Sequence, residues 1–205
     1  MSTKPKSAIL VCLAIALSAT SLSGCMGLQM NPQERSFFTA LDDFNIQTEL
    51  NARLIGESGV LFANVNSTVL EGRIHMTGTV ATQGERLQVT RMAWAIPAVK
   101  EVINDIEVTS ETNVVDTARD HWITAQVRSL ILNDKAIRDS NYTIDTENAV
   151  VYVHGIAQDR LELDRVLRHA NSVAEAKRVV NYALLKDDPR RFTQPGQRTA
   201  SQQSW

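Results

Sequence analysis

The side chains that could do chemistry in this 205-residue chain are two cysteines, four histidines and many carboxylates. No histidine stands at metal-ligand spacing from another or from a cysteine, so we interpret all four as surface residues. Two glutamates lie near the starts of predicted helices, where negative charge complements the helix dipole. No phosphate loop, nucleophile elbow or Ser-His-Asp pattern is present, so we expect no enzyme, metal or cofactor. These residues are His75, His121, His154, His169, Glu85 and Glu162.

Trp122 is the residue with the clearest potential for binding. It precedes Ile123 by one helical step, about 100° around the axis, which predicts a position at the edge of the buried stripe. Tryptophan favours membrane interfaces, and Arg119 and Arg128 lie on the same helix, whose N-terminus suits a phosphate. These features predict contact with an anionic phospholipid. A tryptophan packed between two domains fits the same residues equally well.

The N-terminal segment carries a second chemical signal, because an apolar run ends there in a cysteine. Two lysines precede the apolar residues 8–22, a run shorter than the roughly 20 residues that a spanning helix needs. Residues 22–25, Leu-Ser-Gly-Cys, resemble the lipobox of bacterial lipoproteins. That resemblance implies cleavage before Cys25, acylation of its thiol and a third chain on the new N-terminus. Several acyl chains anchor a protein firmly, at roughly 0.8 kcal/mol per buried methylene. An ordinary signal peptide with an incidental cysteine is the alternative.

Composition limits the other possibilities. Cys12 lies in the segment expected to be removed, so lipidation of Cys25 leaves no thiol for a disulfide or for catalysis. A formal charge of −2 with 43% hydrophobic and 21% charged residues describes a folded globular protein. It excludes a basic nucleic-acid binder and a disordered chain. Met26 follows Cys25, a pattern associated with sorting to the outer membrane, so we expect the periplasmic face of that membrane.

An internal repeat occupies most of the remaining chain. Sliding the sequence against itself by 77 positions aligns identical residues without a gap, and apolar positions agree where identity fails. Each copy reads as helix, strand, strand, helix, strand, with the hairpin turn of the first copy at Gly72 and a helix cap in the second at Asp116. This order predicts an α+β fold in which a three-stranded mixed sheet packs two helices on one face and meets solvent with the other. Identical pairs include Ile46 with Ile123, Gly78 with Gly155, Glu85 with Glu162 and Asn104 with Asn181.

The repeat resembles the BON domain family. The family motif places a glycine at the end of the second strand, here Gly78 and Gly155, and a Val-x-Asn near the start of the last, here 102–104 and 179–181. The resemblance implies an α/β sandwich of two tandem BON domains. Ala149 stands where the first copy has the hairpin glycine, which leaves the turn type of the second copy open.

A lipobox followed by two such domains is similar to a family of outer-membrane lipoproteins. The best local match is residues 120–124, Asp-His-Trp-Ile-Thr, with 127–129, Val-Arg-Ser. This resemblance favours the lipid interpretation and implies a lipid contact made by Arg119, His121, Trp122 and Arg128. It implies a non-enzymatic lipoprotein that binds anionic phospholipid through its second domain and supports outer-membrane integrity. The alternative is a periplasmic adaptor for envelope assembly machinery, with Trp122 as the anchor for a protein partner.

The expected division of the chain follows from these features. We predict a signal peptide at 1–24, a lipidated tether at 25–42, BON domains at 43–111 and 112–186, and a disordered tail at 187–205.

Overall fold

The structure is a computed structural model that describes residues 37–58, 62–109 and 114–195. The predicted signal peptide, Cys25 and most of the predicted tether lie outside the described residues. Among the helices of the described part, none combines the length and apolar character that crossing a bilayer requires.

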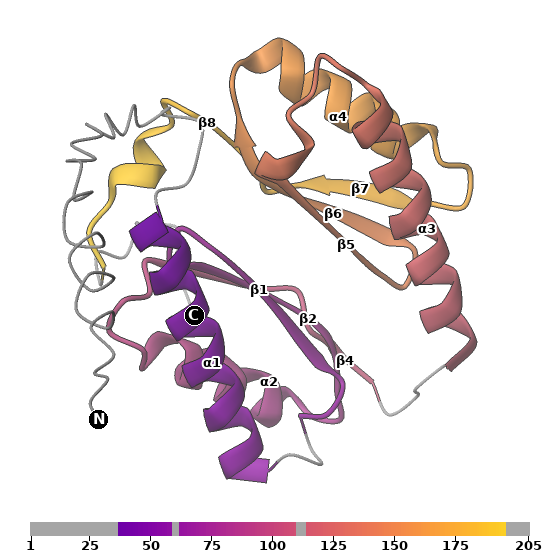
Figure 1. The fold of residues 1–205 in the computed structure, drawn as a ribbon. Helices are drawn as coiled ribbons and strands as arrows, with labels where there is room; N and C mark the ends of the chain where they lie inside the picture. The colour runs from indigo at the N-terminus through magenta and orange to yellow at the C-terminus, as the bar shows by residue number, and fades with distance from the viewer. Residues whose placement is uncertain (1–36, 59–61, 110–113, 196–205) are drawn as a thin grey trace, which may run out of the picture.

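Both copies have the predicted order of elements, with the last strand in two pieces (Figure 1). Asn104 and Asn181 explain the interruption, because each side-chain carbonyl accepts the backbone N–H two residues on, at 3.0 and 2.9 Å. The first copy contains α1 (Phe37–Ser58), β1 (Val65–Leu70), β2 (Arg73–Val80), α2 (Gln83–Trp94), β3 (Glu101–Asn104) and β4 (Glu107–Val108). The second contains α3 (Val114–Asn133), the 3-10 turn η1 (Asp139–Asn141), β5 (Tyr142–Glu147), β6 (Val150–Ala157), α4 (Arg160–Ser172), β7 (Arg178–Asn181), β8 (Leu184–Leu185) and the 3-10 turn η2 (Pro189–Phe192).

Each sheet is mixed, as predicted. β1 runs antiparallel to β2, while β3 and β4 pair in parallel with successive parts of β2, and the second sheet repeats this pattern around β6. The two helices of each copy cover one face of its sheet (Figure 1). Each copy buries its own apolar core there, one centred on Leu50 and Val89 and the other on Val127 and Val166. Helix α3 begins at Val114, two residues before the predicted cap.

The second hairpin turn shows why a glycine is dispensable there. Asn148 and Ala149 both have positive φ, 52° and 63°, the conformation that Gly72 adopts in the first copy at 76°. The buried carboxylate of Asp120 accepts both turn N–H groups, at 2.7 and 2.8 Å. Asp43 does the same for the first turn. A helix carboxylate thus offsets the strain at Ala149, and the two turns are alike.

The uncovered sheet faces do not meet solvent as the sequence predicts, because they pack against each other. Figure 1 shows the two sheets facing each other, with the helices on the outside. His75 and His154 point into this interface and are only 3% and 4% exposed, and Arg73 and Thr77 are buried beside them. The interpretation of all four histidines as surface residues is therefore wrong. The polar face of each sheet is covered by the equivalent face of the other domain.

The two domains are related by an approximate two-fold axis. Residues 77 positions apart, which are equivalent in the repeat, meet directly across the interface. An isologous contact has this property on its axis. The pairs are Thr68 Oγ1 with Asp145 Oδ2 at 2.8 Å, Tyr182 hydroxyl with Asp105 Oδ2 at 2.7 Å, and the rings of His75 and Tyr152 at 4.7 Å between centroids.

The C-terminal segment also differs from the prediction of a disordered tail. Residues 189–192 form η2, and Arg191 reaches the first domain, where it pairs with Glu71. Residues 196–205 lie outside the described part of the chain.

Candidate functional site

Trp122 stands on the outer face of α3. Its side chain is 60% exposed, whereas Ile123 and Val127 are fully buried. Val127, at the centre of the buried stripe, follows Trp122 by five residues, about 140° around the helix. Trp122 therefore lies nearly opposite the core rather than at the edge of the stripe. A tryptophan packed between the domains is excluded by this exposure.

The other three predicted lipid contacts flank this outer face instead of forming one cluster. Arg119, half-buried, is about 60° from Trp122 on one side. His121 and Arg128 are exposed and lie about 100° and 120° away on the other side. Between the flanks, the outer face contains Trp122 and Leu132, which is 67% exposed.

The exposed surface of α3 carries no carboxylate between residues 117 and 133. Asp120 is the acidic residue of this stretch, and it is 7% exposed because it holds the hairpin N–H groups. An apolar centre with cationic flanks and no exposed acid is the pattern of a helix that lies in an anionic membrane interface. A groove of about 510 Å³ beside α3 is lined by Arg128, Leu132 and Asp139.

Sequence reasoning missed the polar cluster between the sheets. His75 Nε2 lies 3.0 Å from Asp105 Oδ2, and the Tyr182 hydroxyl donates to the same oxygen. The hydrogen bond with His75 is the main reason that the pKa of Asp105 lies below its usual value. Burial, followed by the charges of His75 and Arg73, lowers the pKa of His154 to about 3. The sequence did offer one signal of a covered sheet face. Histidine and tyrosine occupy positions of the strands that point away from the helices.

The His154 ring has no hydrogen bond at Nε2, which lies 3.9 Å from Asp145 Oδ2. His169, the fourth histidine, is half-buried and its Nε2 lies 2.9 Å from Asp134. Of the four histidines, His121 is the exposed one, as was predicted for all four.

A cleft of about 700 Å³ opens between the domains where the linker connects them. His121 lines it together with Asp120, Glu107 and Glu147. These carboxylates already have partners: Asp120 binds the hairpin, Glu107 accepts from Asn148, and Glu147 accepts from a side-chain amide. Burial, with the charge of Asp120, raises the pKa of Glu147. Across the described ranges, no group of three or more His, Cys, Asp or Glu side chains could hold a metal ion.

The two glutamates near helix starts have structural partners. Glu85 forms a capping box with Thr82 at the start of α2. Glu162, at the start of α4, is 6% exposed and accepts the backbone N–H groups of Arg138 and Gln158. These contacts explain both residues without a catalytic role.

Comparison with known proteins places this geometry in a family. The family model of the BON domain matches residues 42–110 and 119–186. An "Uncharacterized protein in gshII 5'region" of Anaplasma centrale is 36% identical over 147 residues, which is 71% of this chain and 96% of that protein. The "Outer membrane lipoprotein DolP" of Haemophilus influenzae is 24% identical over 70% of this chain and 80% of its own length. The "Osmotically-inducible protein Y" of Escherichia coli is 21% identical over 69% and 71%. The chain therefore belongs to the BON-domain family, and it carries two copies of that domain.

Proposed function

We propose that this protein is a lipid-anchored envelope protein that binds anionic phospholipid through the outer face of α3 and performs no catalytic step. The observation that carries the proposal is the exposed Trp122 on a helix surface that has no exposed carboxylate between residues 117 and 133. Its indole offers a large apolar body with one polar N–H, which suits the headgroup region of a bilayer. Arg128 and His121 on one flank and Arg119 on the other would meet phosphates.

The anchor in this proposal is Cys25. Cleavage after residue 24 and acylation of the thiol would hold the chain on the periplasmic face of the outer membrane, with the residues before α1 as a tether to the two domains. The similarity to a protein named as an outer membrane lipoprotein supports this location. Eleven residues separate Cys25 from Phe37 at the start of α1, a span of at most about 40 Å. The domains would therefore stay close to the bilayer, where weak contacts by α3 become effective.

Vesicle flotation tests the lipid contact. The chain starting at Met26 suits this assay, since both apolar cores lie within the described residues and no acyl chain contributes to binding. We expect it to float with vesicles that contain phosphatidylglycerol and to remain behind with purely zwitterionic vesicles. Added salt should weaken the binding, because exposed charges are screened over roughly 8 to 10 Å.

Three variants separate the contact surface from the rest of the protein. Trp122→Ala should weaken flotation about tenfold or more, and Arg128→Gln less. Leu161→Ala is the matched control, because Leu161 is an apolar side chain, 73% exposed, on α4. The control should bind normally. Equal losses in Trp122→Ala and Leu161→Ala, or a wild type indifferent to anionic lipid, would contradict the proposal.

A second candidate function, that of a protein-binding adaptor in the envelope, is favoured by a different surface. Helix α1 exposes Phe44 and Ile55, which are 65% and 71% exposed, and Leu41, which is 44% exposed. At their spacing these three residues share one face of α1. Monomeric proteins seldom expose such a stripe without a binding role. If the Phe44→Ser variant lost the protein's function in the envelope but still bound vesicles, the adaptor hypothesis would be favoured.

A further inference from the structure

The contact between the two domains has little apolar area to hold it. Leu70, Ile156 and Leu184 form the small apolar cluster between the sheets. Around them, the interface is made of rings and polar groups such as His75 and His154. Polar interfaces between domains permit relative motion unless a further restraint fixes them. The arrangement of the two domains therefore depends on what holds the ends of this contact.

The two ends are equivalent under the approximate two-fold axis, and each is held differently. At one end, the chain leaves β4 and continues through residues 109–113 into α3, so a covalent linker joins the domains. Glu107 there accepts a hydrogen bond from Asn148, in the hairpin turn of the second domain, at 3.0 Å. At the other end, the chain leaves β8, and residues 186–193 cross onto the hairpin turn of the first domain. We name residues 186–193 the C-terminal strap.

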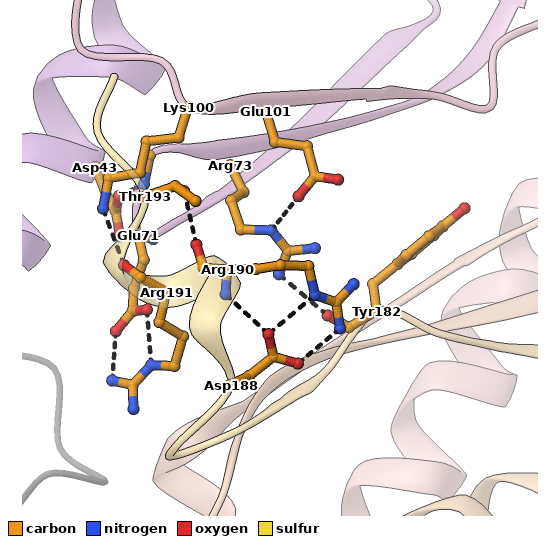
Figure 2. Close-up of polar contacts among 11 residues, drawn as sticks. Asp43, Glu71, Arg73, Lys100, Glu101, Tyr182, Asp188, Arg190, Arg191 and Thr193 are labelled. Atoms are coloured by element: carbon orange, nitrogen blue, oxygen red, sulfur yellow. Dashed lines mark hydrogen bonds and ion pairs between the residues drawn. The ribbon is translucent and has the colours of Figure 1, made fainter. Parts of the chain in front are cut away.

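Arg191 makes the central contact of the strap (Figure 2). Its Nε and Nη2 donate to the two carboxylate oxygens of Glu71, at 2.9 and 2.7 Å, in a bidentate pair. Both side chains are only 8% exposed. Removing one partner of such a buried pair leaves the other charge buried and unpaired. This costs far more stability than the loss of a surface ion pair.

Further hydrogen bonds shape the strap and place it on the first domain. Lys100 Nζ donates to the carbonyl of Arg191 at 3.3 Å, and Arg191 Nη1 donates to the carbonyl of Lys186 at 2.5 Å. The carboxylate of Asp188 accepts hydrogen bonds from the backbone N–H and from the guanidinium of Arg190, all within the strap (Figure 2). Arg190 thus stabilises the turn, while Arg191 reaches across to the other domain.

We propose that the C-terminal strap is a latch that keeps the two domains closed on each other, and that its release lets them separate as two folded units that remain joined by the chain. Each domain keeps its own apolar core after release, because neither core contains strap residues. Opening would bring water to His75 and His154, which the closed form buries. It would also change the direction in which α1 points relative to α3. This inference is independent of lipid binding.

Distance measurement between two spin labels tests the latch. The chain starting at Met26 contains no cysteine, so Leu87→Cys on α2 and Leu161→Cys on α4 give one label per domain. These side chains are 47% and 73% exposed, so labelling should leave the cores intact. We expect a narrow distance distribution in the otherwise wild-type chain. In Arg191→Gln the distribution should broaden and shift to a second population.

Arg190→Gln is the matched control, because this arginine pairs within the strap. It should keep the narrow distribution. The charge exchange Glu71→Arg with Arg191→Glu should restore much of the narrow distribution that Arg191→Gln loses, which separates latch loss from misfolding. A narrow distribution in Arg191→Gln would overturn the proposal. Equal broadening in Arg190→Gln, or no recovery in the exchange, would overturn it as well.

Discussion

Lowering the pH from about 7.5 to about 5 should destabilise the second domain through His154. This imidazole is 4% exposed and lacks a hydrogen bond at Nε2, and its burial lowers its pKa to about 3. The unfolded chain titrates near 6.5. Below that pH the unfolded state binds a proton that the folded state refuses, so stability is lost as the pH falls.

The magnitude follows from the two pKa values. At about pH 5 the unfolded histidine is protonated and the folded one is not, and the pH lies about 1.5 units below the unfolded pKa. Each unit is worth about 1.36 kcal/mol, so the free energy of unfolding should fall by about 2 kcal/mol between about pH 7.5 and 5. The depressed pKa of Asp105 acts only below its ordinary value of 3.8, outside this range.

Urea denaturation followed by circular dichroism at the two pH values measures the loss. His154→Thr is the matched variant, because threonine stands at the equivalent position of the first domain, Thr77, where it is also buried. The variant should lose about 2 kcal/mol less than the wild type over the same range. Equal losses in the two proteins would refute the reasoning, since the remaining titrating groups are common to both.

Three further outcomes are expected. Cys25→Ala should abolish metabolic labelling with a fatty acid, and persistent label would contradict the lipid anchor. Asp120→Asn should lower the free energy of unfolding by about 1.5 to 3 kcal/mol in calorimetry, because a charged acceptor of two buried N–H groups is weakened. Gly155→Ala should cost at least about 3 kcal/mol in the same measurement, since its φ is 153° and a Cβ would overlap the carbonyl oxygen of Asn141. Gly84→Ala is its control, because a Cβ there meets nothing closer than 3.7 Å and should change stability little.

The fold within each domain could be predicted because local pattern determines it. Apolar spacing marked the helices, and Gly78 and Gly155 marked the points where β2 and β6 stop pairing with β1 and β5 and the backbone passes too close for a side chain. The turn at Ala149 could not be predicted, because its conformation depends on Asp120, which lies 29 positions earlier. Such a contact leaves no periodic signal.

The site was predicted less completely than the fold. Trp122 was identified from its type and neighbours, but its exposure depends on the exact rotation of α3 against the sheet. The burial of the histidines was misjudged for a related reason. The alternation of apolar and polar residues along a strand distinguishes its two faces, but it does not show what covers either face. The two polar faces fit each other, and only the three-dimensional arrangement shows that they meet. Arg191 was missed for the same reason, since its partner Glu71 is 120 positions away.

The axis between the domains has a consequence for how the two copies could diverge. In a homodimer of one copy, a residue on the axis faces itself, so Asp105 would meet a second aspartate and repel it. Joining the copies in one chain removes that restriction, because each side of the axis is then encoded separately. Three unlike pairs now stand there: threonine with aspartate, histidine with tyrosine, and aspartate with tyrosine. A single gene for both halves thus permits two different residue types, such as tyrosine and aspartate, to face each other on the axis, which no symmetric assembly of identical chains can achieve.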